Sequence, residues 1–445
     1  MHGKLRFYPN AIPCMILSRT IPLRSISPLR ITSRTMSSHS NSSQMDQNLY
    51  ISTIDAEPLQ RYRQGGYHPV TLGKCLKFGR YKVLHKLGWG GYSTVWAARD
   101  QRLCKLLLVH REQTYTAVKI SVAEREHNGD TRELQTLKLL ASHQPLPNHT
   151  VYMLDHFDLK GPNGSHKCLV YELLGPNVPD IIDASFPNGR LPGKLAKIIA
   201  KQCLIGLDSL HQLKIGHGDL HTRNLAFAMP HIDNLTEEKF IEILGKPEVG
   251  YVQKRDGKFL EAGVPEYVVR PASYGNNSWI LAQDVKIIDF GESFLHTAPP
   301  ETLHTPLSLR APEVIFQDHI DYRVDLWSMG CMLFELFAGQ SPFDTFLITP
   351  RILVGQIREM ATDELPERWQ DQLNTMNTGD VMATETVGPN SQEWLEEVYF
   401  DGPLSPDLTR EDIVRLGQII ERLLRFEPSA RASARQVLDD PWFNE

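Results

Sequence analysis

The side chains best suited to chemistry lie in one short run near the middle of the chain, His217-Gly218-Asp219-Leu220-His221-Thr222-Arg223-Asn224. Asp219 can accept the proton of a hydroxyl group, and Asn224, five residues later, can ligate a metal ion. Further along, Asp289-Phe290-Gly291 follows an apolar strand expected at 285–288, and its carboxylate can hold Mg²⁺ across nucleotide phosphates. For Asp-Phe-Gly alone, which is common by chance, an ordinary turn is the alternative, but both motifs fit phosphoryl transfer.

Two earlier motifs supply what such chemistry needs around a nucleotide. A glycine-rich loop between two expected strands, Leu87-Gly88-Trp89-Gly90-Gly91-Tyr92-Ser93-Thr94-Val95, lets backbone N–H groups approach phosphate oxygens. A dinucleotide-binding fold is disfavoured because its glycines open a helix. Lys119, in the apolar strand with Ala117, needs an anionic partner, and Glu133 on the following helix is the candidate. A structural hairpin and a surface-facing lysine are the alternatives.

The elements that must position these residues change character along the chain. Strands are expected at 81–87, 93–98, 114–122 and 168–174, with one helix at 130–141. That helix should begin with Asp130 and Glu133 as a capping pair and bury Leu134, Leu137 and Ala141. Long helices are expected at 191–213, 325–337 and 413–426, and Arg431 is a candidate partner for Glu313. We therefore predict an α+β, bilobed fold.

Composition excludes several classes of protein. The 445 residues are 41% hydrophobic and 22% charged, which is ordinary for a soluble globular chain. The net charge of −6 does not suggest nucleic-acid binding through a basic surface. The six cysteines contain no Cys-x-x-Cys pair, so neither a zinc site nor a disulfide framework is indicated. The most apolar stretch, 327–339, is too short to span a membrane.

The N-terminal region differs from the rest. Residues 1–45 contain nine serines, six basic residues and no acid, a composition typical of a mitochondrial transit peptide. The alternative is a disordered leader, with Met36 as a second start. Residues 46–445 carry 41 basic against 53 acidic residues, and this net charge of −12 would attract a basic partner.

In this order and context, the motifs resemble the protein-kinase signature over about residues 81–445. A closer resemblance is to the SR-protein kinases, the kinases of serine/arginine-rich splicing factors in the CMGC group. It is carried by Gly65-Gly66-Tyr67-His68-Pro69-Val70, Lys86-Leu87-Gly88-Trp89-Gly90, Ser93-Thr94-Val95-Trp96 and Val170-Tyr171-Glu172-Leu173-Leu174-Gly175. The resemblance implies a leader at 1–64, a β-rich N-lobe at 65–174, and a helical C-lobe at 175–445 with an insert at about 225–283.

The resemblance also implies cofactors and roles. ATP and Mg²⁺ are expected, with Lys119 pairing with the α- and β-phosphates and with Glu133. Asp219 would deprotonate the substrate hydroxyl, and Asn224 and Asp289 would hold Mg²⁺. Tyr171 would be the gatekeeper. The remaining ATP contacts would come from Leu87, Gly88, Gly90, Gly91, Ser93, Val95, Ala117, Glu172 and Leu174.

Two departures from the general kinase pattern bear on mechanism. Gly218 replaces the Arg on which a phosphorylated activation segment docks, so we expect constitutive activity. Loss of the segment's hydroxyls, on Thr297, Thr302, Thr305 and Ser308, should then leave activity intact. His221 replaces the usual Lys, and Arg223 could supply the missing γ-phosphate contact. A catalytically weak pseudokinase scaffold and an aminoglycoside- or choline-type phosphotransferase, whose catalytic loop is similar, remain alternatives.

The substrate is suggested by charge. Residues 358–401 contain eleven acids against two arginines, which is either a solvated acidic face or a docking groove for Arg-rich substrates. By resemblance, we expect an Arg/Ser-rich protein substrate, a part in regulating mRNA splicing, and a monomer in cytoplasm and nucleus, or in mitochondria if residues 1–35 act as a transit peptide. Direct nucleic-acid and membrane binding are not expected.

Overall fold

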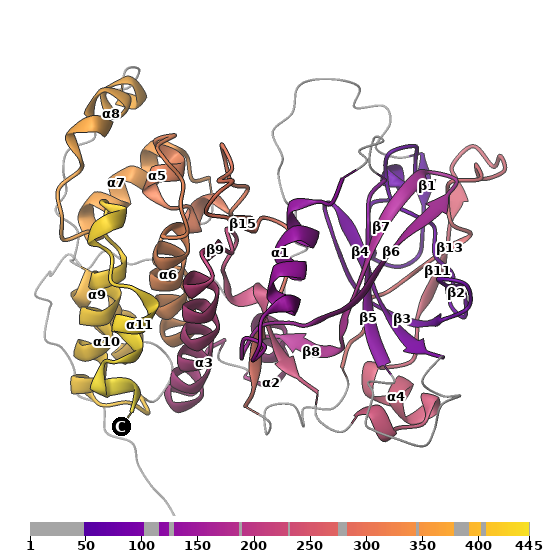
Figure 1. The fold of residues 1–445 in the computed structure, drawn as a ribbon, viewed down its shortest axis with the longest axis horizontal. Coiled ribbons are helices and arrows are strands. Elements are labelled where there is room, and N and C mark those ends of the chain that lie inside the picture. Colours follow the sequence, from indigo (N-terminus) through magenta and orange to yellow (C-terminus); the bar gives the residue numbers. More distant parts are fainter. Residues whose placement is uncertain are drawn as a thin grey trace, which may run out of the picture. The chain divides into compact units, whose positions relative to one another are not determined.

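The computed structural model describes residues 49–101, 115–123, 129–186, 189–229, 232–274, 283–343, 347–377, 391–401 and 406–444 (Figure 1). The N-lobe is built on one antiparallel sheet with strand order β2-β3-β4-β5-β7-β6. Its strands are β2 (Cys75–Leu76), β3 (Tyr81–Gly90), β4 (Ser93–Asp100), β5 (Tyr115–Ser121), β6 (Met153–Gly161) and β7 (Gly164–Glu172). The glycine-rich loop is the turn between β3 and β4, as predicted.

Strand β5 is buried along most of its length because both faces of the sheet are covered. Side chains alternate across a strand, so Tyr115 and Ala117 enter the main core whereas Val118 and Ile120 enter a second core behind the sheet. Lys119 points to the same face as Ala117, toward the C-lobe. The alternation therefore places the one lysine of this strand in the interior.

Helix α1 (Arg132–Ser142) is present, but its cap and buried face differ from the prediction. The N-cap is Thr131, whose hydroxyl accepts a hydrogen bond from the Leu134 N–H, whereas Asp130 pairs with Lys138. Leu140, not Ala141, joins Leu134 and Leu137 in the core. The helix starts two residues later than expected, and Glu133 lies in its first turn, as it would have with the predicted start.

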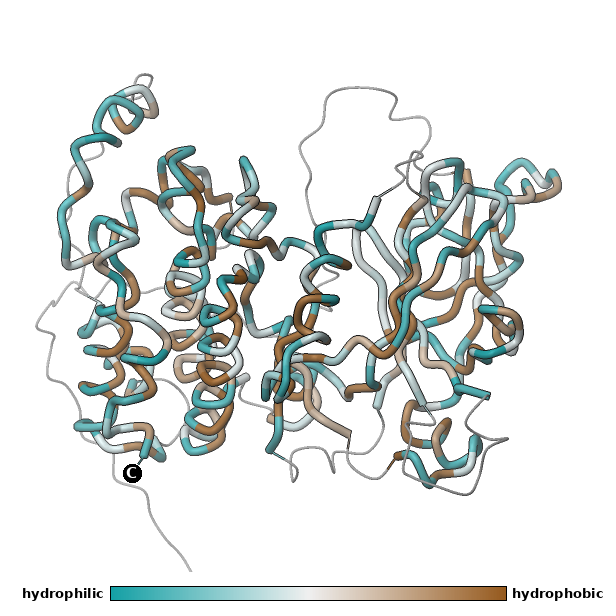
Figure 2. Tube along the Cα trace, viewed as in Figure 1, coloured by the Kyte–Doolittle hydropathy of each residue, from teal (hydrophilic) through white to brown (hydrophobic). Residues whose placement is uncertain are grey.

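The C-lobe consists mainly of helices packed around α6. Its helices are α2 (Val178–Ser185), α3 (Gly193–Gln212), α5 (Pro312–Ile315), α6 (Val324–Ala338), α7 (Pro350–Met360), α8 (Gln370–Asn377), α9 (Ser391–Phe400), α10 (Arg410–Leu423) and α11 (Ala434–Leu438). Helix α6 contacts α3, α9 and α10 and is apolar on nearly every side, as the brown tube in Figure 2 shows. Among the described helices, none combines the length and apolar character needed to cross a membrane.

Small sheets support the loops that carry the polar motifs. Strands β14 (Val285–Ile287), β10 (Leu225–Ala228) and β8 (Leu174–Asn177) form one antiparallel sheet, and β15 (Phe294–Leu295) pairs with β9 (Ile215–Gly216). Strand β10 directly follows Asn224, and β14 directly precedes the loop of Asp289. Their pairing, Leu225 opposite Ile287, therefore brings two loops that are distant in sequence side by side.

The predicted insert was wrong in its first boundary and in its lobe. Residues 225–228 are β10, a core strand, so the insert starts after it. The insert contains α4 (Glu237–Leu244), β11 (Val249–Tyr251), β12 (Gln253–Lys254) and β13 (Tyr267–Val269), and it packs on the N-lobe (Figure 1). Phe240 of α4 stacks on Tyr115 at 3.9 Å between ring centroids, and Val269 completes the second core. These apolar contacts decide its position.

The predicted disordered leader was too long. Residues 49–64 contain β1 (Tyr50–Ile51), which pairs with β12, and a short 3-10 helix, Leu59–Arg61. Glu57 forms a buried ion pair with Lys86 of β3 and accepts a hydrogen bond from Tyr62. The remainder of the leader, and with it the predicted transit peptide, lies outside the described residues.

Candidate active site

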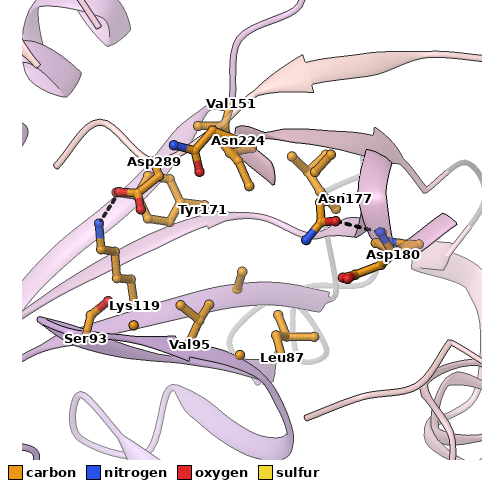
Figure 3. Close-up of a pocket in the computed structure, with 18 of the residues that line it drawn as sticks. Leu87, Ser93, Val95, Lys119, Val151, Tyr171, Asn177, Asp180, Asn224 and Asp289 are labelled. Carbon is orange, nitrogen blue, oxygen red and sulfur yellow. Dashed lines mark hydrogen bonds and ion pairs between the residues drawn. The ribbon is translucent and has the colours of Figure 1, made fainter. Parts of the chain in front are cut away.

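A cavity of about 280 Å³ is lined by both lobes (Figure 3). The predicted nucleotide contacts converge on it from the glycine-rich loop, β5, the end of β7 and two C-lobe loops. Those lining it are Leu87, Gly88, Gly90, Ser93, Val95, Ala117, Lys119, Tyr171, Glu172, Leu174, Asn224 and Asp289. Gly91, which was also predicted, is at the tip of the loop and does not line the cavity.

Lys119 lies at the centre of a charged triad. Its Nζ is 2.7 Å from Glu133 Oε1 and 2.8 Å from Asp289 Oδ1, and Figure 3 shows its side chain directed at Asp289. Burial alone would lower the pKa of Lys119, but the charges of Asp289 and Glu133 outweigh burial and raise it. The Tyr171 hydroxyl donates to Glu133 Oε1 at 3.0 Å, which fixes the carboxylate. The predicted Lys119–Glu133 pair is therefore present.

Asp289 has a backbone conformation that few side chains adopt. Its φ is 61°, in the left-handed region, where Asp and Asn are the least strained residues after Gly. The Lys119 ammonium lowers the pKa of Asp289 to about 2, so this carboxylate is ionised near neutral pH. Asn224 donates from Nδ2 to the Asp219 carbonyl at 2.8 Å, which leaves its amide oxygen as the atom able to ligate a cation. This donor set fits Mg²⁺.

The 217–224 loop is held by a buried carboxylate from α6. Asp325 accepts hydrogen bonds from the backbone N–H groups of His217 at 2.7 Å and Gly218 at 2.8 Å. Gly218 has a φ of 78°, and a Cβ there would lie 2.6 Å from the Glu292 carbonyl oxygen. An arginine at this position would therefore strain the backbone and collide with the activation segment, which explains the departure noted in the sequence.

One carboxylate oxygen of Asp219 accepts no hydrogen bond from the described part of the chain. Within the described part of the chain, its Oδ1 is buried and has no hydrogen-bond partner. Its Oδ2 is 3.6 Å from His221 Nε2 and 3.4 Å from Asn224 Nδ2. Arg223 is exposed and does not line the cavity. His221 and Arg223 were the two basic residues predicted to take over from the usual Lys. Of these, His221 is the one with a described contact to Asp219.

The cavity also contains residues that sequence reasoning missed. Asp180 and Asn177 lie at the start of α2, where the Asn177 side chain accepts from the Asp180 N–H at 2.9 Å (Figure 3). An Asn three residues before an Asp is a helix-start pattern, so this pair could have been found. Tyr274, at the end of the insert, also lines the cavity. No local pattern indicates Tyr274, because its position depends on where the insert folds.

Comparisons with known proteins agree with this geometry. The model of the protein kinase domain matches residues 276–443. The chain is 30% identical over 408 residues to the Serine/threonine-protein kinase SRPK of Physarum polycephalum, covering 87% of this chain and 91% of that protein. The chain belongs to the SR-protein kinase family. Protein kinase dsk1 of Schizosaccharomyces pombe is 26% identical over 87% of this chain and 85% of its own length.

A third relative matches a shorter region. The Serine/threonine-protein kinase SKY1 of Saccharomyces cerevisiae is 33% identical over 47% of this chain and 27% of its own length. Family membership makes this protein a serine/threonine protein kinase.

The buried pair predicted between Glu313 and Arg431 is also confirmed, with N–O distances of 2.6 and 2.7 Å.

The activation segment of this SR-protein kinase is held in part by the hydroxyl of Thr305. Thr305, 4% exposed, donates to the Gly218 carbonyl at 2.7 Å, and Arg310 donates to the Thr305 carbonyl at 2.8 Å. Ser308 is buried as well, whereas Thr297 and Thr302 are exposed. Two of the four hydroxyls are therefore buried and two are exposed. We now expect only the two exposed ones to be dispensable for activity.

We expect the double variant Thr297→Ala/Thr302→Ala to keep its turnover within about twofold of wild type, as exposed positions usually do. Thr305→Val should lower turnover and stability, because the Gly218 carbonyl would be left buried without a donor, at a cost of about 1–3 kcal/mol. Initial rates and thermal unfolding of the wild type and both variants, each preincubated with MgATP so that the segment can be phosphorylated, check this. A large loss in the double variant would show that loop phosphorylation controls the enzyme.

Proposed function

We propose that this kinase uses Mg²⁺-bound ATP in the described cavity to phosphorylate Ser or Thr in Arg/Ser-rich proteins. The observation that supports the reaction best is the unpartnered, buried Oδ1 of Asp219. Asp219 does not itself line the cavity, but it accepts hydrogen bonds from Asn224, which lines the cavity together with Lys119 and Asp289. A buried acceptor without a partner is costly unless a ligand supplies the donor. A substrate hydroxyl is such a donor.

Each side chain then has a defined task. Lys119, which Glu133 orients, would bind the α- and β-phosphates of ATP. Asn224 and Asp289 would hold Mg²⁺, which when bound would neutralise phosphate charge. In the transfer, the hydroxyl oxygen bonds to the γ-phosphorus and the bond from phosphorus to the β–γ bridging oxygen breaks. The hydroxyl proton passes to the Asp219 carboxylate. His221, whose Nε2 lies 3.6 Å from Asp219 Oδ2, is the residue we propose to contact the transferred group in place of the usual Lys.

Turnover measurements separate the candidate functions. ATP consumption should be measured on an Arg-Ser repeat peptide, on a casein-like acidic protein and on an aminoglycoside. We expect phosphate on serine of the Arg-Ser peptide. Transfer only to the aminoglycoside would favour a small-molecule phosphotransferase, and no turnover on any substrate would identify a pseudokinase in which His221 cannot replace Lys.

The fold separates the acids of residues 358–401 into groups with different roles. Asp363 accepts from the backbone N–H groups of Phe426 and Glu427, and Glu396 pairs with Arg410. Two of the eleven, Asp380 and Glu385, lie outside the described residues. The exposed acids before and within α8 form the acidic patch of this proposal, Glu364, Glu367 and Asp371. Those of α9 lie on a different part of the C-lobe (Figure 1).

We expect the triple variant Glu364→Gln/Glu367→Gln/Asp371→Asn to raise KM for the Arg-Ser peptide about tenfold, since exposed charge pairs contribute roughly 0.2–1 kcal/mol each. KM of the wild type should also rise with salt, because screening weakens such pairs. The matched control is Glu393→Gln/Glu397→Gln/Asp401→Asn, which removes three charges outside the patch. Equal effects of both variants, or a KM independent of salt, would contradict docking at the patch.

A further inference from the structure

The glycine-rich loop is attached on its outer side to residues that precede the kinase fold. The Tyr67 hydroxyl donates to the Gly90 carbonyl at 2.7 Å, and Tyr67 is only 1% exposed. At the other end of the turn, the Val122 N–H, just after β5, donates to the Tyr92 carbonyl at 2.8 Å. Two carbonyl oxygens of the turn are thus held from outside the β3–β4 hairpin.

The segment that carries Tyr67 is itself firmly fixed. The Asn163 side chain, in the β6–β7 turn, donates to the Tyr67 carbonyl at 2.7 Å, and the Ala123 N–H donates to the Gly66 carbonyl at 3.0 Å. Gly66 admits no side chain, because a Cβ there would lie 1.8 Å from the Arg61 carbonyl oxygen. We call the hydrogen bond from Tyr67 to Gly90 the tether. Its donor, Tyr67, is therefore held by the turn and strand ends of the sheet and not by the loop.

Arg61 adds a second contact to the turn. Its guanidinium lies 5.1 Å from the ring centroid of Tyr67 and 5.9 Å from that of Tyr92, and a Cβ on Gly91 would be 3.9 Å from its Nη1. The cation thus lies between the anchor and the exposed tip of the loop. The Gly65-Gly66-Tyr67 motif, which has no role in the catalytic chemistry, thus supplies the side chain that contacts both Arg61 and the loop.

We propose that Tyr67 is a positioning residue for ATP binding. It orders the glycine-rich loop before the phosphates of ATP bind. A glycine-rich turn has many accessible conformations, and ordering it costs conformational entropy on binding. A tether to carbonyl oxygens restrains the turn without occupying its N–H groups, the only backbone atoms that can donate to phosphate. This inference rests on the proposed binding of ATP in the cavity.

The test compares ATP with adenosine, which lacks the phosphates, in the full-length chain. Tyr67→Phe should weaken ATP binding and raise KM for ATP about two- to tenfold, the range expected for one hydrogen bond. Adenosine affinity and kcat at saturating ATP should stay close to wild type. The melting temperature should fall only slightly, because Gly90 is exposed and water can replace the lost donor at its carbonyl. Tyr62→Phe is the matched control: it removes a buried hydroxyl that bonds Glu57 instead of the loop, and it should lower the melting temperature without changing the ATP-to-adenosine ratio.

Equal loss of ATP and adenosine affinity in Tyr67→Phe, or no change in either, would overturn the positioning role. Failure of the wild type to bind ATP would instead overturn the proposed function, because the tether could then have no nucleotide to act on. The two failures are therefore distinguishable in one set of titrations.

Discussion

Asp219→Asn is expected to lower kcat by about 10²–10⁴-fold, the usual contribution of a positioned general base. Asparagine has the same shape as aspartate, so the backbone contact between Asn224 Nδ2 and the Asp219 carbonyl should survive. The amide cannot take the hydroxyl proton, however, and its NH₂ group can turn a donor toward the substrate. Single-turnover phosphotransfer to the Arg-Ser peptide, alongside ATP titration, measures the effect.

Asp289→Asn provides the comparison for this prediction. It removes the proposed Mg²⁺ ligand and one of the two anions that pair with Lys119, so it should weaken ATP binding in the presence of Mg²⁺ and also lower kcat. Asp219→Asn, in contrast, should leave ATP affinity nearly unchanged. If Asp219→Asn retained more than about a tenth of the wild-type kcat, a role for Asp219 as general base would be untenable.

Arg431→Met is expected to destabilise the fold by about 3–5 kcal/mol, the cost of leaving a buried charge without its partner. Glu313 and Arg431 are 1% and 0% exposed at the side chain, and their bidentate pair joins α5 to the C-terminal part of the lobe. Arg431 also donates to the carbonyls of Arg425 and Arg323, which would lose their donors. Denaturant unfolding monitored by tryptophan fluorescence measures the change.

The control for this prediction is Arg435→Met. Arg435 lies in the next helix, α11, but is 66% exposed and pairs with Asp439 at 3.5 Å, so its loss should cost at most about 1 kcal/mol. The double variant Glu313→Leu/Arg431→Met should recover part of the stability lost in Arg431→Met, because no unpaired charge remains. Similar unfolding midpoints for Arg431→Met and Arg435→Met would contradict the argument.

Most of the cavity was predictable because its residues occur in short motifs with a clear local context. A glycine-rich turn between two strands, a lysine in an apolar strand and an acid in the next helix must come together once the strands pair. The long helices α3, α6 and α10 lie where the sequence pattern turns helical after Gly175. Strand β6 was missed because it is an edge strand whose residues are at most partly buried, so it lacks a clear apolar pattern.

By itself, the sequence determined the bilobed fold, the Lys119–Glu133 pair and the residues of the catalytic loop, since each depends on local pattern and chain order. It offered Arg431 as a candidate partner for Glu313, 118 residues away, but only the fold brings the two together. Tertiary structure alone decided that the insert covers the N-lobe, that Tyr274 reaches the cavity, that Thr305 is buried and that Tyr67 holds the glycine-rich loop. Such contacts join segments far apart in the chain, and their choice depends on which apolar surfaces are left to cover, which no local spacing encodes.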